Sequence, residues 1–460
     1  MKKYSIILII AAAISMNSCK TAKSLYGKYT PNDSVPENLY GADNSIKQYE
    51  SKSNLADISW RTFFNDDKLI SLIEYGLERN SEIENARLHL QEMEINLATA
   101  KKAFLPSLTF SPKGQITRFD GVTSKIYDVP LMAKWQADIF GNLRNQKEQA
   151  KAYTAQAQDM LQAVQCQLVS NIANLYYQLL KLDNVMEVLK ATEVIRIKSV
   201  ETQKALMSAG MSTSAGVSRM EASLYDVQIR ILDTEHSIAL TERTLCMLLD
   251  ETPHAIQRGR LSDFRMPEIV GTGLPVSMLQ NRPDVRSAQR AVEAAFYGVL
   301  QSKANMYPSL NLQASVGWTT GNSGIVNPGK ILWDALAELT APIFAKGQLN
   351  AAYKIAQIEH DVVKNEFMDV VLCAGHEVNA ALTDCSIAQR KIPVLHNQVE
   401  ALSSAYEATK ELMNHGNVTY LDVLSSQEAL LSAQLSEIEN VEAGVQAVIS
   451  LYISLGGAAK

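Results

Sequence analysis

Residues that could do chemistry are few in this chain of 460 residues, and their spacing fits no catalytic arrangement. The seven histidines are scattered, and His376-Glu377 is not followed by the second histidine of a zinc-protease helix. Gly271-Thr-Gly273 lacks the third glycine of a dinucleotide-binding loop, and no Gly-x-Ser-x-Gly or Walker sequence occurs. We therefore expect no enzymatic activity, no cofactor and no metal site.

Four cysteines in the body of the chain form no Cys-x-x-Cys pair: Cys166, Cys246, Cys373 and Cys385. Cys373 and Cys385 lie in one helical pattern, separated by about 18 Å along the axis, which is too far for a disulfide. We interpret the four as small buried hydrophobic residues, although the sequence does not fix their chemical state.

Asp422 has the most specific setting of the acidic residues. It follows Thr419 by three positions, which fits a variant of the capping box at the start of a helix. Gly416 suits the left-handed position just past the preceding helix, because it has no Cβ to clash there. The stretch 414–425 therefore predicts a tight turn between two long helices, in which Asp422 stabilises the helix N-terminus.

An earlier copy of this turn lies at 208–219. Its Gly210 and Thr213 precede their later counterparts by 206 positions, whereas Gly216 stands at the place of Asp422. Helix capping alone predicts a carboxylate in both copies. The difference indicates a further role for Asp422.

Composition and the N-terminal sequence indicate a folded protein that is exported from the cytoplasm. Apolar residues make up 47% and charged residues 20%, as in folded proteins, and a net charge of −6 without a basic stripe argues against nucleic-acid binding. Lys2-Lys3 and the short apolar run after them predict a signal peptide over residues 1–18, since a membrane-spanning helix needs roughly 20 apolar residues. Cys19 resembles the cysteine of a bacterial lipobox, so we expect it to be lipidated; ordinary secretion with cleavage nearby is the alternative.

The chain then divides into an arm, a repeat and a connector. Residues 19–56 are polar and rich in turn formers, which predicts an extended, lipid-anchored arm. The first structural repeat, 57–250, begins with helical apolar spacing and contains a strand pair at about 105–138 and a long helical hairpin at 141–250. Residues 251–281 form a connector, or equatorial segment.

Residues 282–457 repeat this organisation. Arg282-Pro283-Asp284 starts a helix, a strand pair covers about 308–343, and a long helical hairpin covers 347–455. Pro308-Ser309-Leu310 also repeats Pro106-Ser107-Leu108 after 202 positions. The chain is therefore predicted to be an internal duplication.

Both strand pairs alternate apolar and polar residues, so each strand has one apolar and one polar face. In the first pair we expect two strands joined by a short turn near Asp120-Gly121. Strands of about 10 residues can cross a bilayer in a tilted barrel, with Tyr127 and Trp135 as interface aromatics. A soluble, half-buried hairpin produces the same pattern.

Four strands cannot close a barrel, and an open sheet edge is not viable in lipid, so several chains must share one barrel. Three chains would supply twelve strands. Helices of nearly seventy residues, about 100 Å long, would continue such a barrel as a tunnel across the periplasm.

The chain resembles the TolC/OprM-like outer membrane factors, in particular the NodT-like lipoprotein branch that serves RND-type efflux pumps. The matching stretches lie between Trp60 and Gly457: Trp135–Arg144, Arg282-Pro283-Asp284, Tyr307-Pro308-Ser309-Leu310, the segment from Gly416 to Leu424, and Leu455-Gly456-Gly457. The resemblance implies an α+β, mostly α, duplicated fold in a homotrimer. Its 12-stranded transmembrane β-barrel, with four strands per chain, would continue as a long periplasmic α-helical barrel.

The resemblance also implies a function. The chain would be the outer membrane channel of a tripartite efflux pump, passively conducting small molecules to the exterior. It would be anchored in outer membrane lipid through Cys19, with a periplasmic adaptor and, indirectly, an inner membrane RND-type transporter as partners. The substrates and the particular adaptor and pump are not fixed by the sequence.

In this family an aspartate at the position of Asp422 lies at the narrowed periplasmic end of the tunnel, so three copies would form a negative, cation-binding ring. Ser425 replaces a second acid of well-known members, and Val418 replaces an arginine that locks the closed state in some. The resemblance thus implies a gate that is less tightly latched, or held by packing around Tyr420. The adaptor would dock at the two tips, around Gly210, Thr213, Gly416 and Thr419.

Two other functions fit parts of the pattern. A type I secretion duct would have the same channel but export proteins. A periplasmic coiled-coil adaptor or scaffold also has long hairpins and a lipid anchor, yet carries one hairpin flanked by small β-domains. Two hairpins and two strand pairs in one chain favour the efflux duct.

Overall fold

A computed structural model of the chain describes residues 27–31, 58–261, 281–319, 330–415 and 418–457. Of the expected functional residues, Cys19 and Gly416 lie outside these ranges. Contacts divide the chain into two compact units. The first unit includes residues 88–159 and 286–370, and the second includes 160–285 and 371–460.

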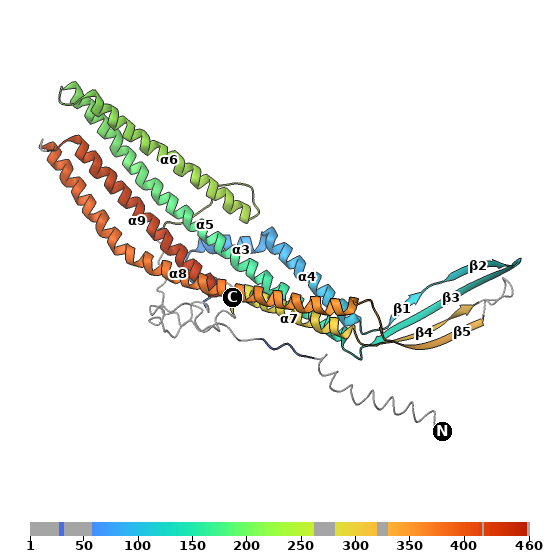
Figure 1. Ribbon diagram of the computed structural model, residues 1–460. Coiled ribbons are helices and arrows are strands. Elements are labelled where there is room, and N and C mark those ends of the chain that lie inside the picture. The colour runs from blue at the N-terminus through green and yellow to red at the C-terminus, as the bar shows by residue number, and fades with distance from the viewer. Residues whose placement is uncertain (1–26, 32–57, 262–280, 320–329, 416–417, 458–460) are drawn as a thin grey trace. The chain divides into compact units, whose positions relative to one another are not determined.

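The main helices come in three pairs of equal length (Figure 1). Helices α4 (Ser81–Lys102) and α7 (Pro283–Ala304) have 22 residues each, α5 (Asn142–Ser208) and α8 (Gln348–Asn414) have 67 each, and α6 (Ser214–Leu248) and α9 (Tyr420–Ser454) have 35 each. Two shorter helices, α2 (Trp60–Phe63) and α3 (Asp67–Arg79), precede α4. Because each pair occupies matching places in the two halves, the predicted internal duplication is confirmed.

The first unit contains an antiparallel sheet of five strands: β1 (Ser107–Phe110), β2 (Lys113–Phe119), β3 (Val122–Ala137), β4 (Ser309–Thr319) and β5 (Lys330–Thr340). The order is β1-β3-β4-β5, and β2 also pairs with β3. We expected β1 and β2 to be one strand. They keep one register, since Phe110 opposes Leu131 and Lys113 opposes Asp128, but Pro112 between them has no N–H to donate to the ladder.

The turn between β2 and β3 is the one that the sequence predicts. Phe119 and Val122 form the last pair of the ladder, and both residues between them have positive φ, at 48° for Asp120 and 75° for Gly121. Two such residues suit a tight type I′ hairpin, for which Asp-Gly is a preferred sequence.

The break between α3 and α4 also follows the sequence. Asn80 accepts hydrogen bonds through Oδ1 from the backbone N–H groups of Glu82 and Ile83, at 2.9 and 3.2 Å, and so caps α4. Its Nδ2 donates to the carbonyl of Leu248 at 2.9 Å. The cap therefore also ties the start of α4 to the end of α6.

The main core lies in the second unit and draws on both repeats. Ile73 from α3, Ile172 from α5, Leu245 from α6 and Tyr452 from α9 are buried there together. The Tyr452 hydroxyl donates to the carbonyl of Ile58 at 2.6 Å. Fully burying such apolar side chains stabilises a fold by roughly 1.5–3 kcal/mol each, so this core holds the roots of the two hairpins together.

The four cysteines within the described ranges are free, and one departs from expectation. Cys166, Cys246 and Cys385 are buried, whereas Cys373 is exposed, which corrects the prediction that all four are buried. Cys166 on α5 belongs to the main core, whereas Cys373 on α8 does not.

Candidate channel face and gate

The sheet has one apolar and one polar face, and its register shows which residues share the apolar face. These are Leu310, Leu312, Ala314, Val316 and Trp318 of β4, Val129, Leu131, Ala133, Trp135 and Ala137 of β3, and Ile331, Trp333, Ala335, Ala337 and Leu339 of β5. The predicted alternation is confirmed across all three strands.

The apolar face is exposed. Leu108 is 71% exposed, Trp318 50% and Trp333 75%. A soluble sheet buries its apolar face against a core, but the described residues leave this one uncovered. The soluble half-buried hairpin is therefore contradicted, and a large exposed apolar surface marks contact with a membrane or another protein.

Among the described helices, none combines the length and the apolar character needed to cross a bilayer.

The opposite face of the sheet is polar. It carries Asp128, Lys134, Asp334 and Glu338. The hydroxyl of Thr319 donates to Asp128 at 2.5 Å, and the hydroxyl of Ser315 on β4 donates to Asp334 on β5. These groups suit a surface in contact with water.

The tip of the first hairpin is a helix end followed by a hydroxyl cap. Gly210 has φ of +74°, its N–H donates to the carbonyl of Met207 at 3.0 Å, and the N–H of Met211 donates to that of Leu206 at 2.8 Å. This is a Schellman motif, and it requires the left-handed residue that glycine provides. Thr213 then caps α6, its Oγ1 accepting from the N–H of Gly216 at 3.2 Å.

The tip of the second hairpin is capped by a carboxylate. One oxygen of Asp422 accepts from the backbone N–H of Thr419 at 2.8 Å and from its hydroxyl at 2.6 Å. These hydrogen bonds hold the pKa of Asp422 below its usual range, because they stabilise the charged form. Asp422 is therefore an exposed, ionised cap.

Packing explains why the first tip lacks this carboxylate. A Cβ at Gly216 would lie 2.8 Å from Nε2 of Gln203 and 3.2 Å from Oγ of Ser212. Gln203 is only 6% exposed, so its side chain has little room to move away. The asymmetry that sequence reasoning ascribed to function alone thus has a local steric cause as well.

Both tips line one cleft of about 440 Å³. Val418, Thr419 and Tyr420 face it from the second tip, and Thr213 and Gly216 face it from the first. The cleft therefore brings Val418 and Tyr420 of the predicted gate together with the predicted docking residues Thr213 and Thr419, whereas Asp422 and Gly210 do not line it.

Ser425 is exposed and is not among the residues that line this cleft.

Tyr420 links the two hairpins. Its side chain packs against a cluster of Val200, Met220 and Leu424, which come from α5, α6 and α9. The hydroxyl of Ser199 donates a hydrogen bond to it, while burial raises the pKa of Tyr420. Tyr420 thus packs against residues of α5 and α6 that the sequence did not connect with it.

Arg196 is a buried cation next to this cluster that sequence reasoning missed. It is 1% exposed, its Nη2 lies 3.9 Å from Oε1 of Glu428, and its Nε and Nη1 have no hydrogen-bond partner. Burial lowers the pKa of Arg196. Because it falls within a long regular helix, no motif or period distinguishes it.

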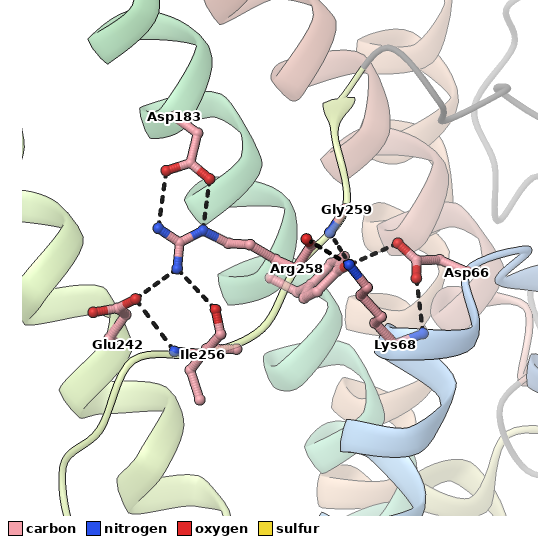
Figure 2. Close-up of polar contacts among 8 residues, drawn as sticks. Asp66, Lys68, Asp183, Glu242, Ile256, Arg258 and Gly259 are labelled. Carbon is pink, nitrogen blue, oxygen red and sulfur yellow. Dashed lines mark hydrogen bonds and ion pairs between the residues drawn. The ribbon is translucent and has the colours of Figure 1, made fainter.

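Arg258 holds the connector against the hairpin (Figure 2). Its guanidinium donates to both oxygens of Asp183 on α5, at 2.6 and 2.9 Å, and to Oε1 of Glu242 on α6, at 2.5 Å. The hydrogen bond to Asp183 and the second carboxylate hold the pKa of Arg258 above its usual range. We call these three residues the Arg258 clamp.

A second set of contacts fixes the same segment to α3 (Figure 2). The hydroxyl of Tyr176 donates to Asp66 at 2.6 Å and accepts from the N–H of Gly259 at 3.0 Å. Nζ of Lys68 donates to the carbonyl of Arg258 at 2.9 Å. Sequence reasoning found neither set, since residues brought together over such separations share no spacing.

The Arg282-Pro283-Asp284 motif connects helices through the side chain of Arg282. Arg282 is 8% exposed and donates to Asp284 at 2.7 Å, to Glu377 on α8 at 2.7 Å, and to the carbonyl of Ser454 at 3.2 Å. It thereby joins the start of α7 to both helices of the second hairpin.

An exposed apolar sheet face, duplicated long hairpins and tips that line one cleft are together the features of a membrane duct. The sequence profile described as outer membrane efflux protein matches residues 72–250 and 274–457. The chain belongs to this family. It is accordingly an outer membrane component of an efflux system.

Individual relatives agree over almost the whole length. The cation efflux system protein CusC of Escherichia coli O6:H1 is 23% identical, with 98% of each chain covered. The solvent efflux pump outer membrane protein SrpC of Pseudomonas putida is 24% identical, covering 86% of this chain and 87% of its own. The solved outer-membrane channel OprN has a TM-score of 0.85 at 22% identity, covering 93% of this chain and 99% of its own, which shows the same fold.

Proposed function

We propose that three copies of this efflux protein assemble into one channel that crosses the outer membrane and continues as a helical tunnel. The exposed apolar sheet face carries this proposal, because only lipid or another copy can cover it. The chain's sheet has open edges at β1/β2 and at β5, and edges inside lipid must be paired. Because β1 and β2 pair with β3 in one register, they count as one barrel strand, and each copy supplies four. Three copies would therefore close a 12-stranded barrel.

Uncovered stripes on the helices of the first unit support the assembly. Ile355, Ile358 and Val362 on α8 are 54%, 62% and 48% exposed, and they recur at helical spacing. Leu88 and Ile95 on α4, seven positions apart, are 52% and 67% exposed. Stripes of this kind are suited to packing against helices of neighbouring copies.

The cargo would be small molecules or ions that pass through without chemical change. The relatives named for efflux carry cations in one case and solvent in another, which fits a passive duct whose cargo is chosen by its pump. No observation favours the protein-secretion duct or the coiled-coil scaffold.

Asp422 would form the gate. Three ionised copies around a threefold axis would favour cations and narrow the closed pore. Tyr420 would hold the closed arrangement by packing against the first hairpin, with Val418 and Ser425 beside it in the sequence. The depressed pKa of Asp422 keeps its charge present at neutral pH.

The tips would also receive a periplasmic adaptor, which connects the channel to an inner membrane transporter. Met211 is 76% exposed and Leu421 is 49% exposed, so each tip presents an apolar side chain beside its cap. An amphipathic helix can dock on such a surface. Thr213 and Thr419, with Gly210 and Gly416 at the turns, would shape these docking tips.

Cys19 would anchor the chain to outer membrane lipid through an acyl modification. Mass spectrometry of the mature N-terminus would test this, since an unmodified Cys19 or cleavage elsewhere would contradict it.

Single-channel conductance in planar bilayers tests the channel and the gate together. We expect a small, cation-preferring conductance from the wild type and a larger, less selective one from Asp422→Asn. Asp233→Asn is the matched control, because Asp233 is exposed on α6 away from the tip.

Two outcomes would count against the proposal. Folded trimers without any conductance would contradict the channel. Equal conductance in all three proteins would leave the channel standing but return Asp422 to helix capping.

A further inference from the structure

Two basic side chains lie on the apolar face of the sheet, beyond its aromatic residues. The ladder places Gly114 opposite Tyr127, Ile116 opposite Lys125, and Arg118 opposite Thr123. All three pairs share the face that carries Leu131 and Trp135, because they follow in steps of two along one register. Arg118 and Lys125 are thus exposed cations on the side that we propose faces lipid.

Their height along the strand places them outside the hydrocarbon. Trp135 and Tyr127 are eight residues apart on β3, about 26 Å along the strand and about 20 Å along the membrane normal at a tilt of 40°. An apolar band of about 25 Å between aromatic girdles is typical of membrane barrels. Lys125 and Arg118 follow one and two rows past Tyr127, which is the depth of lipid headgroups.

Neither cation is paired with an acidic side chain in the part of the chain that the structure describes. Within the described ranges, Arg118 and Lys125 form no ion pair. The link between β4 and β5, residues 320–329, contains no charged residue in its sequence. Diagonal neighbours on one face of an antiparallel pair lie about 7–8 Å apart, so the two like charges repel unless an anion lies between them.

We propose that Arg118 and Lys125 bind the phosphate groups of a phosphorylated lipid in the outer leaflet of the outer membrane. The guanidinium of Arg118 can donate two parallel hydrogen bonds to a phosphate, and Lys125 adds a second positive charge one row nearer the acyl chains. The acyl chains would cover Ile116, which is 74% exposed, and the apolar band below it. This proposal rests on the orientation given under the proposed function.

Lys113 is a matched control. It belongs to the same hairpin, but its register partner is Asp128, so it lies on the polar face. A lipid that covers the apolar face cannot reach it. We therefore compare the double variant Arg118→Gln/Lys125→Gln with the single variant Lys113→Gln. The comparison distinguishes a lipid contact on the apolar face from a general attraction by positive charge.

The experiment measures binding of diphosphorylated lipid A to the purified full-length protein in neutral detergent, by native mass spectrometry at several salt concentrations. Basic residues near an anionic lipid surface contribute about fivefold in affinity each, so the double variant should bind roughly 25-fold more weakly. Lys113→Gln should bind like the wild type, and lipid A without phosphates should bind all three proteins equally weakly.

Three results would overturn the inference: an unchanged affinity in the double variant, an equal loss in Lys113→Gln, or full competition by millimolar inorganic phosphate, which would indicate a site for free anions. Single-channel conductance of the same preparations separates the two proposals. Conducting channels with no difference in lipid binding would refute the headgroup site alone, whereas folded but non-conducting protein would refute the channel.

Discussion

The two ends of the α5–α6 hairpin are held in different ways. Where α6 ends, the connector is fixed by the Arg258 clamp, a half-buried ionic contact to both helices. Where α6 begins, one hydroxyl–amide hydrogen bond caps the helix, and the turn before it exposes Met211. The root is therefore held by ionic contacts between side chains, whereas the tip is held by one capping hydrogen bond and by packing against Tyr420.

This difference fits a gated duct. Elements that move are drawn from the less stable parts of a fold, and here the less stable part is the end that would dock an adaptor and open. The second hairpin differs at its tip. The ionised carboxylate of Asp422 caps the start of α9, whereas the hydroxyl of Thr213 caps the start of α6. The duplication preserved the helix lengths but gave only one tip a capping carboxylate.

The largest effect is expected at the root. Arg258→Ala would leave Glu242, whose side chain is 16% exposed, without its cation, and should lower the free energy of local opening of residues 251–261 by about 3 kcal/mol. Native-state hydrogen exchange of this segment measures that free energy.

Arg230→Ala is the control for this prediction. Its ion pair with Asp226 is exposed on both sides, at 51% and 59%, so its loss should cost about 0.5 kcal/mol or less. Equal, small effects of both substitutions would remove the contrast between root and tip.

A smaller effect is expected from giving the first tip the charge of the second. Gly216→Asp forces a Cβ against buried Gln203 and should destabilise the start of α6 by about 1–3 kcal/mol. Hydrogen exchange of the first turn of α6 would report it, and Gln203→Ala in the same chain should recover part of the loss. If Gly216→Asp is tolerated, packing does not explain why the first tip lacks a carboxylate.

The hydroxyl caps should differ by a still smaller amount. Thr213→Ala removes the acceptor of the Gly216 N–H and should cost about 1 kcal/mol. Thr419→Ala should cost less, since the backbone N–H of residue 419 still donates to Asp422. Amide hydrogen exchange in the first turns of α6 and α9 measures the stability lost in each variant. A larger loss in α9 would show that the Thr419 hydroxyl contributes more to its cap than the Thr213 hydroxyl does.

The least change is expected from pH across the neutral range. Because hydrogen bonds lower the pKa of Asp422, its contribution is complete above the ordinary carboxyl value of about 3.9 and is lost only as pH falls through the lower folded value. Cation preference should therefore stay constant from pH 8 to 5, and should be flat throughout in Asp422→Asn. A midpoint above pH 5 would instead show that neighbouring carboxylates repel one another, as in a tight ring.

Much of the fold could be predicted from local features. Helix lengths, the Asp120-Gly121 turn, the cap at Asn80 and the alternation along β3 to β5 depend on residues close in sequence. The interruption at Pro112 was missed because the alternation continues across it in register. The sequence placed the candidate gate residues at one turn, but their packing partners lie on another hairpin.

The sequence by itself determined the periods, the turns and the duplication, because backbone preferences and side-chain alternation act over a few residues. Only the tertiary structure decided that the apolar sheet face stays uncovered, that Cys373 is exposed whereas Cys166 is buried, and that a Cβ at Gly216 would meet the side chain of Gln203. It also decided that Arg258 meets Asp183 and Glu242. These outcomes depend on which surfaces meet when distant segments pack, and that information is spread over residues that no local pattern connects.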